Sequence, residues 1–159
     1  MIKVLFVCLG NICRSPLAEG VFVQKAKNQN VNELFFADSA GTASYHIGKL
    51  PDIRSRQVAQ KNGFELTHLA RAFKLSDFYE FDFIIAMDKD NLSNIKRLMP
   101  EDATPKILLM RHFDTTGKDQ EVPDPYYGEL KDFEKVYAIL DRSCDVMLGF
   151  LMDELKQAR

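Results

Sequence analysis

The sequence is poor in the features that mark several large protein classes. Its three cysteines are an odd number in 159 residues, and their spacing fits neither a disulfide framework nor a zinc-binding pattern. No apolar run approaches the length needed to span a bilayer, and no signal-peptide cleavage site follows the first apolar residues. The net charge is −2 without a basic tract, which argues against nucleic acid as a partner. We therefore expect a cytoplasmic protein that binds neither nucleic acid nor membrane.

What the sequence does contain is an alternation of extended and helical patterns. With 46% apolar residues, a chain of this size can bury one core, so we expect a single domain over residues 1–159. Strands are predicted at 2–7, 34–37, 81–87 and 106–110, and helices at 16–27, 52–61, 90–99 and over the carboxy-terminal segment. This alternation predicts an α/β fold, a small doubly wound four-stranded parallel sheet in the flavodoxin-like order 2-1-3-4.

Apolar side chains recur at helical spacing through the carboxy-terminal segment, which predicts an amphipathic helix laid on the sheet. Cys144 lies on this apolar stripe, and we interpret it as a small buried side chain rather than a reactive thiol. Before this helix, residues 111–129 show no periodicity. A loop of that length is typically functional or disordered, and we expect a functional one.

The first strand ends in a cysteine, and an arginine follows six residues later, across the loop that leads into the first helix. In this C-x5-R arrangement of Cys8 and Arg14, backbone N–H groups converge on one point and the helix amino terminus adds partial positive charge. The Arg14 guanidinium is a planar fork that holds two oxygens of a phosphate. The same field favours a thiolate on Cys8. The sequence therefore predicts a phosphate site with a cysteine nucleophile beneath it.

Three further residues shape this loop. Gly10 permits close approach of the backbone, and Asn11 tolerates the positive φ that a tight cradle requires. Ser15, a favoured N-cap residue that precedes Pro16, either caps the helix or donates a hydrogen bond to the Cys8 sulfur. Both roles of Ser15 stay open from the sequence.

Motifs through nearly the whole chain resemble those of the low-molecular-weight protein tyrosine phosphatases, in that family's order. They are Cys8-Leu9-Gly10-Asn11-Ile12-Cys13-Arg14-Ser15, Asp38-Ser39-Ala40-Gly41-Thr42, His68-Leu69-Ala70-Arg71, Met87-Asp88 with Asn91, and Asp124-Pro125-Tyr126-Tyr127-Gly128. The resemblance implies hydrolysis of phosphotyrosine in proteins, and of small aryl phosphates, through a cysteinyl-phosphate intermediate. It also implies no cofactor, no metal, inhibition by phosphate and other oxyanions, and a monomer or weak homodimer.

Asp124 is the candidate proton donor. Once Cys8 attacks, the leaving aryloxide needs a proton and a water must later be activated, and one carboxyl group performs both steps in turn. Asp124 lies in the long loop after the fourth strand, which emerges at the same sheet edge as the cysteine loop. The alternative is that Asp124 only shapes the Asp-Pro turn. The resemblance favours catalysis.

The resemblance also implies supporting and substrate-binding residues. Ser39 and His68 hydrogen-bond the loop through Asn11. Asp88 either orients Arg14 or closes the pocket floor, with capping of the following helix as its alternative. The loop binds phosphate, and aromatic side chains on both sides hold a flat aryl ring. The substrate-binding residues are Leu9, Gly10, Asn11, Ile12, Cys13, Ser15, Tyr45, Tyr126 and Tyr127.

Cys13 has two interpretations. A second thiol in the phosphate loop allows an oxidised Cys8 to be resolved as a Cys8–Cys13 disulfide, which blocks irreversible over-oxidation. The alternative is a passive small side chain. The sequence alone leaves both open.

Three other functions fit a C-x5-R loop. Arsenate reductases need a further thiol pair, which Cys144 on a buried stripe does not supply. Protein arginine phosphatases are expected to carry threonine where this chain has Ile12 and phenylalanine where it has Tyr126, so Ile12 favours an aryl ring. A non-catalytic phospho-ligand module would need no nucleophile and no Asp124. The segment 111–116 is the least typical of the family, and we expect it to tune the rim of the site.

Overall fold

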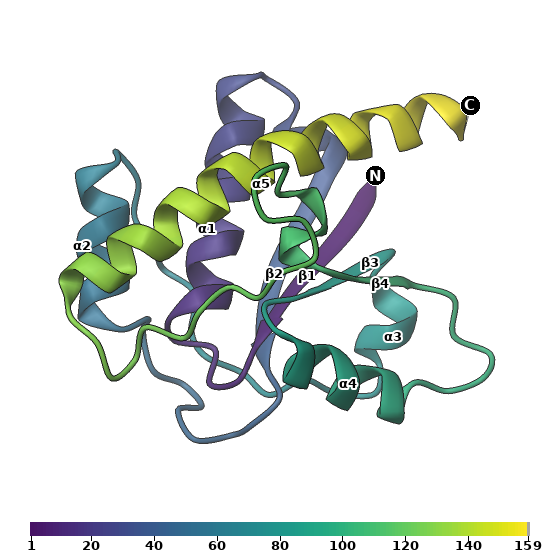
Figure 1. Cartoon of the computed structure of the whole chain (residues 1–159). Helices are drawn as coiled ribbons and strands as arrows, with labels where there is room; N and C mark the ends of the chain where they lie inside the picture. Colours follow the sequence, from purple (N-terminus) through teal and green to yellow (C-terminus); the bar gives the residue numbers. More distant parts are fainter. Residues whose placement is uncertain (159) are drawn as a thin grey trace.

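The computed structural model describes residues 1–158. At its centre is a four-stranded parallel sheet in the order β2-β1-β3-β4, which confirms the predicted α/β fold and strand order (Figure 1). Arg159, the last residue of the predicted single domain, lies outside the described residues. The strands are β1 (Ile2–Cys8), β2 (Phe35–Gly41), β3 (Phe83–Ala86) and β4 (Lys106–Leu109).

Helices cover both faces of the sheet. They are α1 (Arg14–Asn28), α2 (Ile53–Lys61), α3 (Asp77–Glu80), α4 (Lys89–Leu98) and α5 (Leu130–Gln157). One face packs against α1 and the long α5, with α2 beside them, and the other packs against α3 and α4 (Figure 1). Two 3-10 turns, η1 (Asn32–Leu34) and η2 (Met110–Phe113), precede β2 and follow β4.

The central strand β1 is apolar on both faces, as its unbroken hydrophobic run predicts. Val4 and Phe6 point into the core beneath α1 and α5, while Leu5 and Val7 point into the core beneath α3 and α4. All four side chains are fully buried. Because parallel strands end at one edge of a sheet, the last residue of β1, Cys8, lies at the carboxyl edge between β2 and β3.

The amino terminus of α1 differs from the prediction. The helix begins at Arg14 with Cys13 at the N-cap, and no side chain caps it. The Ser15 hydroxyl instead lies 3.0 Å from the Cys8 sulfur and accepts a hydrogen bond from Asn11 Nδ2 at 2.8 Å. Of the two roles left open for Ser15, the structure shows the contact with the Cys8 sulfur and not the cap, because the polar groups of the cysteine loop take up the hydroxyl.

Other boundaries also differ from the predicted ones. β2 continues to Gly41 because its polar end, residues 38–41, pairs with β1 along the whole length of that strand. β3 is shorter than the predicted 81–87. Neither α3 nor η2 was predicted, since each is about one turn long and leaves no periodic pattern.

The carboxy-terminal helix α5 carries the predicted apolar stripe. Its buried residues are Phe133, Val136, Ile139, Leu140, Ser143, Cys144, Met147, Leu148 and Leu151. Cys144 is fully buried, as predicted, and this burial raises the pKa of its thiol. In residues 1–158 no helix combines the length and the apolar character that crossing a membrane requires.

Replacing a buried residue of this stripe tests how far α5 stabilises the fold. Leu140 is fully buried, so Leu140→Ala should lower the free energy of unfolding by about 2–5 kcal/mol, because it removes apolar contacts and leaves a cavity. The expected drop in Tm is roughly 5–15 °C by calorimetry. The matched control is Val146→Ala on the exposed side of α5, with an expected change within about 0.5 kcal/mol. Equal effects of the two substitutions would contradict this packing.

Candidate active site

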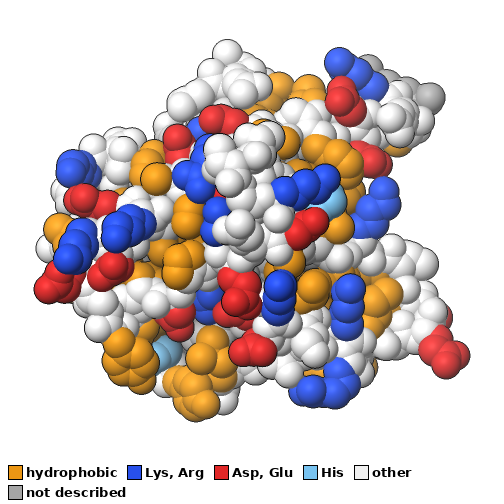
Figure 2. Space-filling model, in the orientation of Figure 1, with side chains coloured by type: hydrophobic (Ala, Val, Ile, Leu, Met, Phe, Trp, Pro, Cys, Tyr) orange, Lys and Arg blue, Asp and Glu red, His pale blue; other side chains and the backbone are white. Residues whose placement is uncertain are grey.

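A cleft of about 260 Å³ opens at the carboxyl edge of the sheet. Its floor is the loop between β1 and α1, and its sides come from the segments that follow β2 and precede α5. Figure 2 shows hydrophobic side chains gathered at the lower left edge of the molecule, where these loops lie in Figure 1. The cleft is lined by Cys8, Leu9, Gly10, Ile12, Cys13, Arg14, Tyr45, His46, Asp124, Tyr126 and Tyr127.

Cys8 lies in the floor of this cleft with only 3% of its surface exposed. Two polar groups face its sulfur. Ser15 Oγ lies 3.0 Å away, and the backbone N–H of Asn11 donates to the sulfur at 3.3 Å. Hydrogen-bond donors at this distance stabilise negative charge on sulfur. The loop therefore holds Cys8 in a position and an environment that suit a nucleophile.

Arg14 is buried beside Cys8, at the start of α1. Its Nη1 donates to Asp88 Oδ2 and to the carbonyl of Val122, both at 2.8 Å, and its Nη2 lies 3.8 Å from Asp124 Oδ2. Burial alone would lower the pKa of Arg14, but the neighbouring Cys8 and Asp88 outweigh it and raise the pKa above its ordinary value. The guanidinium is thus a fixed positive charge at the cleft.

Asp88 fills two of the roles considered for it. One carboxylate oxygen accepts the hydrogen bond from Arg14. The other accepts the backbone N–H of Asn91 at 2.8 Å and so caps α4, while the Asn91 side chain accepts the Asp88 N–H in return. Capping of α4 therefore fixes the carboxylate that orients Arg14.

Asp124 reaches the cleft from the segment before α5. Its side chain is 44% exposed, so it is open to water and to a ligand. One of its oxygens accepts the backbone N–H of Tyr126 at 3.1 Å, which is the turn contact considered for the Asp-Pro pair. The other oxygen is the one nearest to Arg14. The turn contact therefore orients the carboxylate and leaves its second oxygen toward the cleft.

Aromatic rings form the sides of the cleft. Tyr45 and Tyr127 are highly exposed, and Tyr126 is 37% exposed. His46 stands between the two sides, with its ring centroid 6.3 Å from that of Tyr45 and 6.1 Å from that of Tyr126. A Cβ at Gly10 would lie 3.1 Å from His46 Cδ2, so glycine there lets His46 approach the loop. The arrangement suits a flat ring above the cysteine loop.

Arg54 of α2 holds one of these aromatic sides in place. Its Nη atoms donate to the carbonyls of Tyr126 and Gly128 at 2.9 and 2.8 Å, and its guanidinium lies 4.3 Å from the Phe133 ring centroid. Asp52, the N-cap of α2, accepts from Arg54 on the other side. The side-chain hydrogen bonds from Arg54 are the main reason why the pKa of Asp52 is lowered.

Asn11 holds the cysteine loop in shape from behind. Its backbone φ is 57°, in the left-handed region, and its side chain is buried. The side-chain oxygen accepts from His68 Nε2 at 2.8 Å and from the backbone N–H of Arg71 at 2.9 Å. The side-chain nitrogen donates to Ser15 Oγ at 2.8 Å and to Ser39 Oγ at 3.0 Å. One amide thus ties the loop to α1, to β2 and to the segment around residues 68–71.

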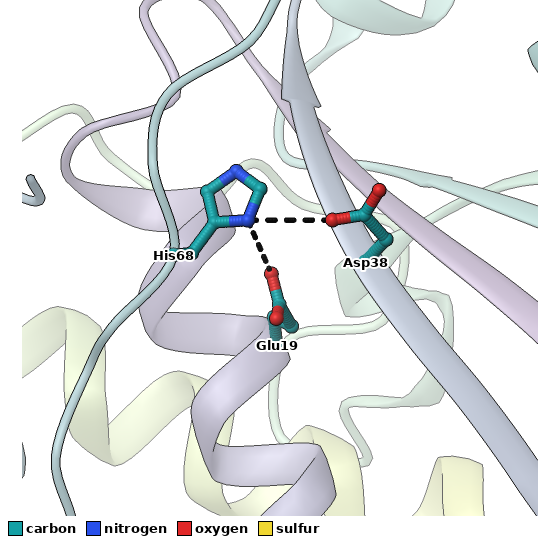
Figure 3. Close-up of side chains that lie close together, drawn as sticks. All are labelled: Glu19, Asp38 and His68. Atoms are coloured by element: carbon teal, nitrogen blue, oxygen red, sulfur yellow. Dashed lines mark ion pairs between the residues drawn. The ribbon is translucent and has the colours of Figure 1, made fainter. Parts of the chain in front are cut away.

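Two carboxylates face the other ring nitrogen of His68 (Figure 3). Nδ1 lies 3.4 Å from Glu19 Oε1 and 3.3 Å from Asp38 Oδ1. Burial raises the pKa of Glu19, while for Asp38 the hydrogen bonds from His68 and Ser39 outweigh burial and lower the pKa. The ligand atoms of these three residues lie within 4.8 Å of one another. Nε2 of His68 faces the Asn11 oxygen and Nδ1 faces both carboxylates, so this ring links the Asn11 amide to Glu19 of α1 and Asp38 of β2.

Comparison with known proteins identifies the family. The sequence pattern of the low molecular weight phosphotyrosine protein phosphatases matches residues 3–158. The protein of that name from Schizosaccharomyces pombe is 45% identical over 137 residues, which cover 86% of this chain and 88% of the relative. This chain belongs to the low molecular weight phosphotyrosine protein phosphatase family.

Solved structures agree with this assignment. The crystal structure of the protein tyrosine phosphatase from Entamoeba histolytica superposes with a TM-score of 0.92 at 44% identity, over 97% of this chain and 99% of that one. A Drosophila arginine phosphatase superposes with a TM-score of 0.88 at 33% identity, over 94% of this chain and 98% of that one. The fold is therefore shared by phosphatases named for two different substrates.

In this member of the phosphatase family, most predicted site residues meet at the cleft. All three proposed catalytic residues and all three tyrosines line it, together with Leu9, Gly10, Ile12 and Cys13. Asn11 and Ser15, predicted to bind substrate, do not line the cleft, because the side chains of both are buried. Ser39 and His68 contact Asn11 rather than the cleft.

Three residues of the phosphatase site were absent from the sequence-based prediction. His46 lines the cleft, Arg54 holds the aromatic side, and Val122 offers its carbonyl to Arg14. Only His46 gave a local signal, because it adjoins Tyr45 in a polar loop. The other two act through contacts between distant parts of the chain, which spacing along the sequence does not reveal.

The three thiols should differ in reactivity. Burial, reinforced by Asp52, raises the pKa of Cys13, and burial raises that of Cys144, so both are held as thiols at neutral pH. We expect iodoacetamide at neutral pH to alkylate Cys8 first, and phosphate to protect it, as measured by peptide mass spectrometry. In the Cys8→Ser control the protein should stay unmodified over the same period. Alkylation of Cys13 or Cys144 ahead of Cys8 would contradict this site.

Proposed function

We propose that this phosphatase hydrolyses phosphotyrosine in proteins, and small aryl phosphates, through a cysteinyl-phosphate intermediate. The observation that carries the proposal is the meeting of Cys8, Arg14 and Asp124 in one cleft with aromatic sides. A thiol, a fixed cation and an accessible carboxyl group are the three parts that transfer of a phosphoryl group to sulfur requires.

The substrate phosphate is bound by the cysteine loop. The loop N–H groups and the α1 amino terminus face it, and Arg14 holds two of its oxygens. The aryl ring lies between Tyr45 and Tyr126, which shield it from water. Inorganic phosphate and other oxyanions fit the same loop and therefore act as competitive inhibitors.

Catalysis proceeds in two steps. The Cys8 sulfur attacks phosphorus, the bond to the phenolic oxygen breaks, and Asp124 donates its proton to that oxygen as it leaves. Water then attacks the phosphocysteine, Asp124 takes the proton from this water, and phosphate leaves as the Cys8 thiolate is restored. Arg14 stabilises the charge on the phosphoryl oxygens in both steps.

The position of Cys13 supports a redox role for this second thiol of the cleft. Hydrogen peroxide oxidises the Cys8 thiolate to a sulfenic acid, and the Cys13 thiol then forms the Cys8–Cys13 disulfide as water leaves. Both residues line the cleft and both are free. Because burial raises the pKa of Cys13, Cys8 is the first target of the oxidant.

The cysteine content also supports a cytoplasmic location. Cys8, Cys13 and Cys144 are all free thiols. Free thiols of this kind persist in a reducing compartment, where the proposed Cys8–Cys13 disulfide would form only under oxidant and would then be reversed.

Phosphoarginine is the second candidate substrate, since a Drosophila arginine phosphatase shares the fold. Ile12 favours an aryl ring instead, because its apolar side chain lines the cleft and offers no hydrogen-bond partner to a guanidinium group. The tyrosines on the two sides of the cleft favour an aryl ring.

Turnover of three phosphopeptides tests the function directly. Without added metal, wild-type protein should hydrolyse a phosphotyrosine peptide in preference to phosphoarginine and phosphoserine peptides, and Cys8→Ser should hydrolyse none. Released phosphate is the measurement. A preference for phosphoarginine would move the protein to the arginine phosphatases, and activity that survives in Cys8→Ser would overturn the mechanism.

The role of Asp124 predicts a dependence on the leaving group. Asp124→Ala should lower kcat/KM for phenyl phosphate by about 10²–10⁴-fold, because the phenol then leaves without a proton. An activated substrate such as dinitrophenyl phosphate should be least affected, since its leaving group needs no proton. Unchanged turnover of phenyl phosphate would remove Asp124 from the mechanism.

A further inference from the structure

The segment after β4 contains a buried ionic cluster outside the cleft. Asp114 is 1% exposed and accepts hydrogen bonds from Arg111 Nε at 2.9 Å and from Arg142 Nε and Nη2 at 2.9 and 3.1 Å. Thr116 donates two more. These donors, Arg142 foremost, hold the pKa of Asp114 below its ordinary value. Asp114 is therefore a fixed anion between η2 and α5.

Arg111 and Arg142 differ in what else they hold. Arg111 donates through Nη1 to the carbonyl of Glu121 at 3.0 Å, and its own carbonyl accepts the N–H of Asp119 at 2.9 Å. Within residues 1–158, the guanidinium of Arg142 hydrogen-bonds only to Asp114. Arg111 thus links the buried Asp114 carboxylate to the segment that runs from Glu121 back to the cleft. Arg142 makes no such link.

The segment from Glu121 to Asp124 carries two groups of the site, the Val122 carbonyl and the Asp124 carboxylate. Val122 follows Glu121, is fully buried, and donates its N–H to the carbonyl of Met87 at 2.9 Å. The Val122 carbonyl accepts from Arg14 Nη1 at 2.8 Å. Asp124 lies two residues further along. The anchor at Glu121 is therefore three residues from the proton donor and adjacent to a carbonyl that orients the phosphate-binding arginine.

We propose that Arg111, held by Asp114, is a positioning residue for the proton donor of the reaction. It fixes the start of the segment 121–124, so that the Val122 carbonyl meets Arg14 and the Asp124 carboxylate faces the cleft. The inference rests on the proposed function. Without the anchor the segment shifts, and proton transfer to the leaving oxygen is impaired because its efficiency depends on sub-ångström placement of the acid.

Gly117 offers a way to move the Arg111 guanidinium without removing it. A Cβ at this position would overlap Arg111 Nη2 and crowd Cζ, so the guanidinium must shift to make room. Gly117→Ala therefore displaces the guanidinium from the position in which it contacts Asp114 and the Glu121 carbonyl, while the charge stays in the protein. The two variants Arg111→Ala and Gly117→Ala test the same contact by different means.

The experiment measures kcat/KM for a series of aryl phosphates whose phenols differ in acidity. For Arg111→Ala and Gly117→Ala we expect a loss of about 10- to 100-fold with phenyl phosphate and of less than about threefold with dinitrophenyl phosphate. The matched control is Arg142→Ala, which removes the other cation of Asp114. It should lower Tm but keep the leaving-group dependence of the wild type.

Three outcomes separate the possibilities. A steeper leaving-group dependence in Arg111→Ala and Gly117→Ala, but not in Arg142→Ala, supports the positioning role. The positioning role is overturned if Arg111→Ala and Gly117→Ala both keep the wild-type leaving-group dependence, or if this dependence changes equally in all three variants. The cluster would then only support the fold. If Asp124→Ala itself keeps the wild-type dependence, the proposed function fails instead, so the two failures are distinguishable.

Discussion

The cysteine loop between β1 and α1 depends on a single residue in a strained backbone conformation. Asn11 has a φ of 57°, which costs a residue other than glycine on the order of 1–3 kcal/mol. Its side chain offsets this cost with four hydrogen bonds to Ser15, Ser39, His68 and Arg71. The same conformation directs the Asn11 N–H at the Cys8 sulfur. The strained conformation therefore places a donor at the Cys8 sulfur, and the groups that maintain it come from distant parts of the chain.

The protein has a net charge of −2, but the charged side chains at the cleft are held in place by local contacts. Arg14 is a buried cation whose partners, Asp88 and the Val122 carbonyl, occupy one Nη atom and leave the other toward the cleft. Asp88 is fixed in turn because it caps α4. An anion in the loop would therefore meet a cation that is already oriented, so little reorganisation accompanies binding.

The sequence was sufficient for the parts of the molecule that local pattern determines. The apolar run that ends in Cys8 predicted the central strand, and the six-residue step to Arg14 predicted the loop and the cleft floor. The sequence was insufficient where one polar side chain has several possible hydrogen-bond partners. The sequence left open whether the Ser15 hydroxyl caps α1 or contacts Cys8, and in the structure Asn11 and Cys8 take it up, which no property of Ser15 itself reveals. Arg54, Arg111 and Val122 act across many residues of sequence, through carbonyl groups that carry no signature in the sequence.

Trapping of the phosphocysteine shows whether the phosphoryl group passes through the Cys8 sulfur, as proposed above. Wild-type protein is mixed with an aryl phosphate labelled in the phosphoryl group and quenched within a turnover, and the labelled peptide is identified by mass spectrometry. We expect label on Cys8, in stoichiometric amount in the first turnover, and none in Cys8→Ser. Label on any other residue, or rapid turnover with no labelled protein, would contradict it.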